Sequence, residues 1–73
     1  MITLVFMAGR ETFSIRINGR NIVYFDKYGA KDLVKGFNSE ELAEYDKAIS
    51  EEELADICKR DCARQGYRFL YKK

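Results

Sequence analysis

Two cysteines, Cys58 and Cys62, have the most distinctive chemistry in the chain, and they lie four positions apart in a helical pattern. At that spacing in a helix the Cβ atoms are about 5–6 Å apart, whereas a disulfide needs about 3.8 Å. A zinc site would need two further thiolate or imidazole ligands, and the chain contains no histidine. We therefore interpret both cysteines as reduced thiols in the core, and we expect no metal or other cofactor.

Carboxylates are concentrated in residues 37–56, which hold eight acidic and one basic side chain for a net charge of −7. Glutamates at helix starts are favoured by the helix dipole, and this alone could explain the cluster. The alternative is an acidic surface that docks on a basic partner and mimics a phosphate backbone. The predicted acidic surface consists of Glu40, Glu41, Glu44, Asp46, Glu51, Glu52, Glu53 and Asp56.

Basic residues dominate the end of the chain, where residues 57–73 hold six basic and one acidic side chain. Cations in the last turns of a helix also suit its dipole, so solvation is the simplest interpretation. A phosphate-contacting stripe is the alternative, and it predicts affinity for nucleic acid that falls steeply with salt. The basic set for this hypothesis is Arg16, Arg60, Arg64, Arg68, Lys72 and Lys73.

Catalysis is not indicated by any motif. The absence of histidine removes the commonest general base, and no Gly-x-Gly-x-x-Gly, phosphate-binding-loop or Gly-x-Ser-x-Gly pattern occurs. A cysteine nucleophile would need an activating base or a positive setting, whereas Cys58 and Cys62 lie on a stripe predicted to be buried. We predict that the protein is not an enzyme.

The first third of the chain predicts three strands, over residues 2–7, 12–17 and 20–26. A two-residue turn at Gly9-Arg10 would pair apolar residues throughout the first hairpin, Phe6 with Phe13 among them. The dipeptide Asn18-Gly19 predicts a type I′ turn for the second hairpin. Residues 27–38 are less regular, with at most one helical turn near residues 30–35.

Two helices are predicted over residues 40–65, with a break at Ser50, which begins a capping-box pattern. In a single straight helix two apolar stripes would face opposite sides of the molecule, whereas a break lets both face one sheet. These stripes are Leu42, Tyr45 and Ile49, and Leu54, Ile57, Cys58 and Cys62. Gly66 would end the second helix, and residues 67–72 predict a last strand.

The predicted fold is a small α+β domain spanning residues 1–73, with elements in the order β-β-β-α-α-β. Because an antiparallel helix pair returns the chain to the same end, the last strand can pair with the first. This gives a mostly antiparallel four-stranded sheet of order 4-1-2-3, with both helices on one face.

The other face of this sheet would be unusually apolar for a surface in contact with water, and such patches often mark interaction sites. The predicted outer patch consists of Val5, Met7, Arg16, Val23, Phe25 and Leu70. This assignment places Tyr67, Phe69 and Tyr71 on the helix side, and Arg68 and Lys72 on the outer side. With the last strand reversed, the exposed aromatics would favour single-stranded nucleic acid.

The leading hypothesis is a small non-enzymatic protein-binding module, a regulator or inhibitor that uses the acidic surface and the outer patch. One concrete form is an anti-defence inhibitor encoded by a phage or other mobile element, presenting carboxylates to a nucleic-acid channel. The alternatives are nucleic-acid binding through the basic set and a homodimeric structural subunit. No apolar run approaches the roughly 18 residues that cross a bilayer, and no secretory signal is recognised in residues 1–7, so we expect a cytoplasmic protein with no membrane partner.

Overall fold

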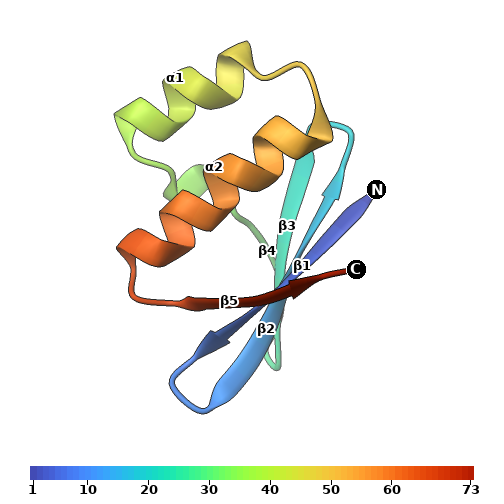
Figure 1. Cartoon of the computed structure of the whole chain (residues 1–73), viewed down its shortest axis with the longest axis vertical. Helices are drawn as coiled ribbons and strands as arrows, with labels where there is room; N and C mark the ends of the chain where they lie inside the picture. The colour runs from blue at the N-terminus through green and yellow to red at the C-terminus, as the bar shows by residue number, and fades with distance from the viewer.

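The computed structural model describes all 73 residues of the chain and shows an antiparallel sheet with two helices packed on one face (Figure 1). The elements are β1 (Ile2–Ala8), β2 (Glu11–Asn18), β3 (Asn21–Asp26), β4 (Gly29–Asp32), the short 3-10 helix η1 (Val34–Gly36), α1 (Ser39–Lys47), α2 (Glu51–Arg64) and β5 (Arg68–Lys72). The predicted α+β class is confirmed.

The sheet has five strands in the order β4-β3-β2-β1-β5, so the predicted four-stranded sheet is wrong in its strand count. The last strand does pair with β1, as expected. The additional strand, β4, forms because the chain reverses tightly after β3. The Asp26 carboxylate accepts a hydrogen bond from the Tyr28 N–H at 2.7 Å, and Gly29 has a φ of +117°. Sequence alternation could not reveal this strand because all four of its residues are exposed.

The first hairpin has the predicted register, with Phe6 opposite Phe13. The second hairpin differs, because Asn18 pairs with Asn21 and the two-residue turn is Gly19-Arg20. A type I′ turn at Asn18-Gly19 would need positive φ at Asn18, and only glycines have positive φ in this chain. A turn with Gly19 first needs a positive φ at the glycine alone. The register shift is two residues, so every side chain keeps its predicted face.

The core lies between the sheet and the helices. The inward side chains of β1, β2 and β3 form one wall, and α2 forms the other. The completely or nearly completely buried residues are Leu4, Phe6, Ile15, Ile17, Leu54, Cys58, Asp61 and Cys62. Phe37 closes one edge of this core, with Leu33 and Val34 packed against it.

The predicted packing face of α1 is right for Tyr45 and wrong for Leu42 and Ile49. Leu42 is partly exposed and Ile49 is 91% exposed, whereas Glu41 and Ala48 are buried and Tyr45 packs against the core. The cause is local hydrogen bonding. Asn38 caps the helix and accepts from the Glu41 N–H at 2.8 Å, while the Glu41 carboxylate accepts from the Asn38 N–H at 2.9 Å. This capping box holds Glu41 on the inward side of the first turn, and Leu42 next to it is left exposed, whereas Ile49 lies beyond the end of the helix.

The second helix begins and ends as expected. The Ser50 side chain accepts from the Glu53 N–H at its start. At its end Gly66, with a φ of +85°, allows the Tyr67 N–H to donate to the Cys62 carbonyl at 2.9 Å, the pairing of a Schellman motif. None of the helices is both long enough and apolar enough to span a membrane.

Both cysteines are free and buried, as predicted. Burial raises the pKa of the Cys58 thiol and raises that of Cys62 to about 12.

Because the thiolate is the reactive form, we expect both thiols to react with iodoacetamide at pH 8 roughly 100-fold more slowly in the native protein than in 6 M guanidinium chloride. Mass spectrometry of quenched samples measures the rate, and comparable native and denatured rates would contradict the buried placement.

The last strand is split by a register shift opposite Val5 and Phe6. Before the shift, Phe69 faces the helices and its ring lies 5.4 Å from the Phe6 ring. After it, Tyr71 pairs with Val5 and lies on the outer face, while the Lys72 ammonium reaches Glu52 on α2 at 2.8 Å. The predicted faces of Tyr71 and Lys72 are therefore exchanged.

Candidate interaction surface

The outer face of the sheet has no helix over it, because α1 and α2 both lie on the opposite side (Figure 1). The strand pairings place one row of side chains across all five strands at the middle of this face. The central row consists of Tyr71, Val5, Ser14, Phe25 and Ala30. Only Ser14 and the Tyr71 hydroxyl interrupt its apolar character.

Two flanking rows extend the patch. Arg16 and Val23 are paired on one side of the central row, and Arg68 and Met7 are paired on the other. The guanidinium of Arg16 lies over the Phe25 ring, 4.9 Å from its centroid. We call the central row together with Arg16, Val23, Met7 and Arg68 the outer sheet face.

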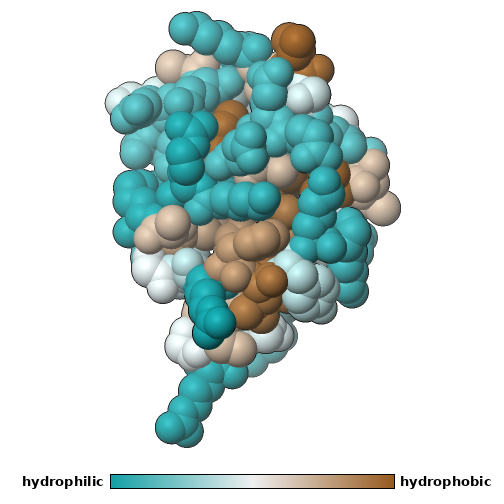
Figure 2. Space-filling model, viewed as in Figure 1, coloured by the Kyte–Doolittle hydropathy of each residue, from teal (hydrophilic) through white to brown (hydrophobic).

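The side chains at the centre of this face differ in their exposure. Val5 is only 8% exposed although no core element covers it, while Tyr71 beside it is 50% exposed. In Figure 2 an apolar area interrupts the hydrophilic surface over the region where β5 crosses the sheet. The arrangement places an aromatic ring on either side of Val5 and Ser14.

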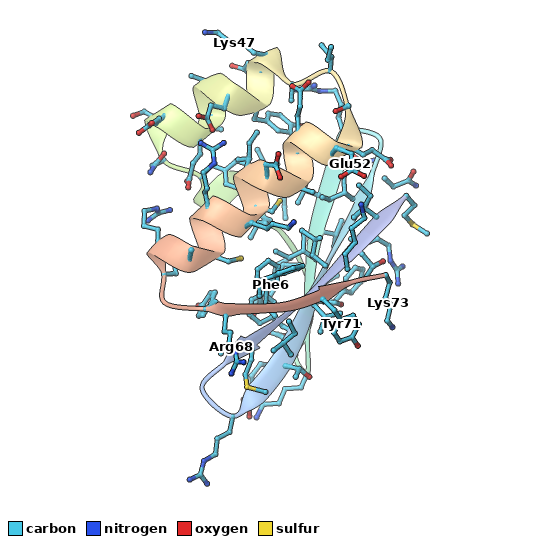
Figure 3. All side chains as sticks on the ribbon, viewed as in Figure 1. Phe6, Lys47, Glu52, Arg68, Tyr71 and Lys73 are labelled. Atoms are coloured by element: carbon cyan, nitrogen blue, oxygen red, sulfur yellow. The ribbon has the colours of Figure 1, made fainter.

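Five of the six residues in the predicted outer patch lie together on this face, and the sixth, Leu70, lies at the register shift of β5. Tyr71 was missed because uninterrupted alternation from Tyr67 predicts an inward side chain. Nothing in the sequence signals a bulge between Phe69 and Tyr71. Figure 3 shows Tyr71 together with the basic residues Arg68 and Lys73 near the two ends of the last strand.

The cations on this face have no acidic partner within the chain. Arg16 and Arg68 on this face, and Lys73 at the end of the chain, take part in none of the ion pairs of the structure. Lys73 lies next to Thr3, whose carbonyl oxygen accepts from the Lys73 N–H at 2.8 Å. The outer sheet face therefore combines an apolar centre with two cations, Arg16 and Arg68, that have no acidic partner, while the Asp32 carboxylate lies at the end of the Arg16–Val23 row.

The predicted acidic surface is largely engaged in contacts within the chain. Glu44 is bound through both oxygens by the Arg60 guanidinium, and Glu52 is paired with Lys72. Glu41 is buried in its capping box. Half of the predicted nucleic-acid set is engaged by the same contacts, because Arg60, Arg64 and Lys72 are the cations that bind these carboxylates.

Two more acidic residues hold backbone groups. Glu51 accepts from the Gly19 N–H at 2.7 Å and pairs with the amino terminus at 3.0 Å, and the Gly19 contact is the main cause of its lowered pKa. Glu53 accepts from the Ile49 N–H at 3.3 Å. Only Glu40, Asp46 and Asp56 of the predicted acidic surface have no bonded partner, so helix capping and ion pairing account for most of the cluster.

A buried carboxylate that sequence reasoning missed is Asp61, which is 1% exposed. It accepts hydrogen bonds from the Arg64 guanidinium at 2.6 Å and from the Gln65 amide at 3.0 Å. Burial, and then the charge of Glu41, raise the pKa of Asp61. Burial alone would also raise the pKa of Glu41, but the Asn38 N–H and Arg64 outweigh it and lower that pKa.

Replacing Asp61 by asparagine is expected to stabilise the protein at pH 7. The amide oxygen still accepts from Arg64, the Gln65 amide can turn to accept from the new NH₂ group, and the buried charge is gone. A carboxyl whose pKa is raised by folding destabilises the native state above its unfolded pKa. The Asp61→Asn variant should therefore have a Tm about 2–5 °C above that of the wild type at pH 7. This difference should disappear as the pH falls below the pKa that the carboxyl has in the unfolded chain. Thermal scans from pH 3 to 8 measure it, and an unchanged Tm difference across this range would contradict the assignment.

No group of three or more histidine, cysteine, aspartate or glutamate side chains is arranged to hold a metal ion. Comparison of the chain with protein-family models, with curated proteins and with solved structures found no match. The function proposed next is therefore inferred from the geometry of the outer sheet face.

Proposed function

We propose that this chain is a non-enzymatic protein-binding module that uses its outer sheet face to recognise a partner with an apolar surface bordered by carboxylates. The observation that carries the proposal is the uncovered central row, in which Tyr71 and Phe25 lie on either side of Val5 and Ser14. Tyrosine, phenylalanine, methionine and arginine are enriched in protein interfaces. A chain of this kind would act as a regulator or inhibitor by occupying its partner's surface.

Charge supports the stated chemistry of the partner. Arg16 and Arg68 flank the central row and have no acidic partner in the chain. Acidic groups at the rim of the partner would pair with them and speed association. The earlier hypothesis of docking through the acidic helices has weaker support, because most of those carboxylates already accept hydrogen bonds or pair with cations of the same chain.

Single-stranded nucleic acid is the second candidate for the same face. Its support is the outward position of Tyr71, which gives the face a half-exposed aromatic ring beside unpaired cations, the combination that single-stranded nucleic acids bind. The other aromatic ring, Phe25, is overlaid by Arg16, which leaves less of its surface for stacking. We therefore favour protein recognition.

The test is affinity capture from source-cell lysate with the full chain, before and after nuclease treatment. The variant R16A/Y71A removes two residues of the outer sheet face. Its matched control, R10A/Y28A, removes the same two residue types from the exposed β1–β2 and β3–β4 turns. We expect wild type and control to retain a nuclease-resistant protein partner, and the outer-face variant to bind it at least about 30-fold more weakly.

Each contrary result has a distinct meaning. Equal retention by R16A/Y71A and R10A/Y28A would contradict the proposed surface. Loss of all binding on nuclease treatment would support nucleic acid, and binding would then weaken with salt at a slope of roughly −0.7 per phosphate contact. Twice the monomer mass in sedimentation, reduced to a folded monomer by Phe25→Asp, would support the homodimeric subunit.

A further inference from the structure

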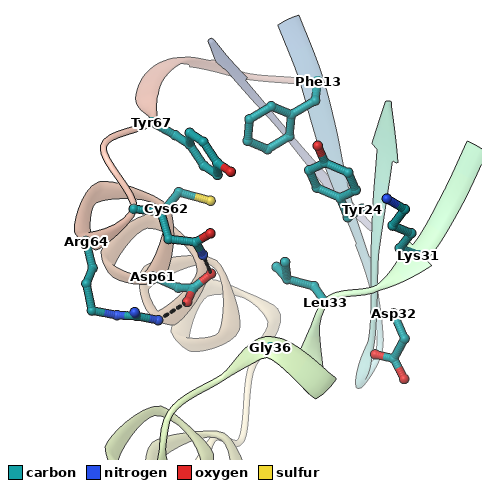
Figure 4. A pocket seen from close by; sticks show the side chains of 11 residues that line it. Phe13, Tyr24, Lys31, Asp32, Leu33, Gly36, Asp61, Cys62, Arg64 and Tyr67 are labelled. Atoms are coloured by element: carbon teal, nitrogen blue, oxygen red, sulfur yellow. Dashed lines mark hydrogen bonds and ion pairs between the residues drawn. The ribbon is translucent and has the colours of Figure 1, made fainter. Parts of the chain in front are cut away.

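A solvent-open groove of about 450 Å³ lies on the helix side of the sheet, where the end of α2 faces β3 and β4 (Figure 4). The loop around Leu33 and Gly36 forms its floor. This groove is on the opposite side of the sheet from the outer sheet face, so it is independent of the function proposed above. Pockets of this size admit small organic ligands.

One wall of the groove is aromatic. The Phe13 ring lies 4.7 Å from the Tyr24 ring and 5.1 Å from the Tyr67 ring, measured between centroids. All three side chains line the groove, and they come from β2, β3 and the segment after α2. Figure 4 shows the Tyr67 hydroxyl directed into the space. The Phe13 ring is tilted by 42° to Tyr24 and by 74° to Tyr67 and is only 5% exposed. The accessible ring surface therefore belongs mainly to the two tyrosines, and a planar ring can pack against them edge-to-face or offset.

The side of the groove formed by β3 and β4 carries one uncompensated positive charge beside Tyr24. Lys31 pairs with Tyr24 across β3 and β4, and its ammonium group points back toward the Tyr24 side of the groove (Figure 4). No carboxylate lies within 4.0 Å of this ammonium group. The chain therefore leaves a free cation beside an aromatic wall.

The other charged groups of the groove are already bound. The Asp61 carboxylate accepts from Arg64 and Gln65, and Arg64 also contacts Glu41. The Asp32 carboxylate accepts from the Val34 N–H at 3.0 Å and points away from the groove in Figure 4. A ligand would consequently meet Lys31 as the one cation of the groove without an acidic partner, while the unpaired Asp32 carboxylate is directed away from it.

We propose that this groove binds a small planar aromatic carboxylate. The ring of the ligand packs against Tyr24 and Tyr67, which Phe13 supports from the core, and its carboxylate pairs with the Lys31 ammonium. An ion pair between the ligand carboxylate and the Lys31 ammonium is stronger than a hydrogen bond from the same ammonium to a neutral group. The groove should therefore select an aromatic carboxylate over an uncharged ligand with the same ring.

Titration of the ¹⁵N-labelled full chain with 2-naphthoate tests this site, with 2-naphthamide as a neutral ligand of the same shape. The variant Lys31→Gln removes the free cation, and Lys35→Gln makes the same change at a lysine that does not line the groove. Both lysines are exposed, so neither change should disturb the fold, and the ¹H–¹⁵N spectra confirm this directly.

We expect saturable shifts of the Leu33, Gly36 and Cys62 amides with 2-naphthoate. The dissociation constant should rise about 10-fold for 2-naphthamide with the wild type and about 10-fold for 2-naphthoate with Lys31→Gln, and should stay unchanged with Lys35→Gln. The proposal is overturned by the absence of saturable shifts at millimolar ligand, by equal binding of acid and amide, or by equal effects of the two lysine variants.

Discussion

Replacing Phe6 by alanine is expected to remove most of the stability of this protein. Phe6 is 1% exposed, its ring stacks on Phe13 at 5.4 Å, and it meets the edge of Phe69 at the same distance. Phe-to-Ala changes in cores cost about 3–5 kcal/mol, and a chain of this length has a total unfolding free energy of roughly 4–11 kcal/mol. The variant should therefore be partly unfolded at 37 °C.

Urea denaturation followed by circular dichroism measures this loss. Tyr71→Ala is the matched control, because it removes an aromatic ring from a neighbouring part of the same strand pair but on the outer face. We expect it to cost about 1 kcal/mol or less. A cost below 1 kcal/mol for Phe6→Ala, or equal costs for the two variants, would show that the core is not where the structure places it.

Replacing Arg20 by alanine is expected to cost about 2 kcal/mol and to loosen α1. The Arg20 guanidinium donates to the Ala48 carbonyl at 2.8 Å and to the Tyr45 carbonyl at 2.7 Å. It also lies over the Tyr45 ring, 4.4 Å from its centroid, and the Tyr45 hydroxyl donates to the Arg20 carbonyl at 2.8 Å. A single hairpin residue thus binds the carbonyl end of α1 to the sheet.

Hydrogen exchange separates this effect from a general loss of stability. In Arg20→Ala the amides of α1 should exchange faster than those of α2, whereas Arg10→Ala in the first hairpin turn should leave both helices unchanged. Arg20→Lys should recover less than half of the loss, because an ammonium group cannot bind both carbonyls in the same planar geometry. Uniform acceleration across both helices in Arg20→Ala would contradict the local role.

Hydrophobic patterning predicted the parts of this fold that depend on apolar residues at regular spacing. It located four of the five strands and the break at Ser50, and it identified the buried stripe of α2 and the pairing of the last strand with the first. It failed where hydrogen bonds of polar side chains determine the local structure. The capping box at Asn38 and Glu41 sets the rotation of α1, and the Asp26 carboxylate initiates the turn that forms β4.

Hydrophobic alternation also predicted the part of the outer sheet face that lies on regular strands, and it failed for the part that depends on an irregular one. Alternation along β1 and β3 placed Val5, Val23 and Phe25 on the outer face, and the strand register confirms this. The position of Tyr71 depends on a register shift that no residue pattern signals.

Charge was the least predictable property. The acidic and basic segments look separate along the sequence, yet Glu44 meets Arg60 sixteen positions away and Glu52 meets Lys72 twenty positions away. The fold brings the two segments together and neutralises much of both. The cations that stay unpaired include Arg16 and Arg68. They could be identified only once the fold had shown which acidic side chains pair with the other cations.

The most direct test of the proposed function is photo-crosslinking from the outer sheet face in source cells. A benzophenone amino acid replaces Ser14, at the centre of the face, or Glu40, an exposed residue of α1 without a bonded partner. Recognition through the outer sheet face predicts a discrete, nuclease-resistant protein adduct from position 14 that is absent from position 40. Adducts of equal yield from both positions, or an adduct from position 40 alone, would contradict it.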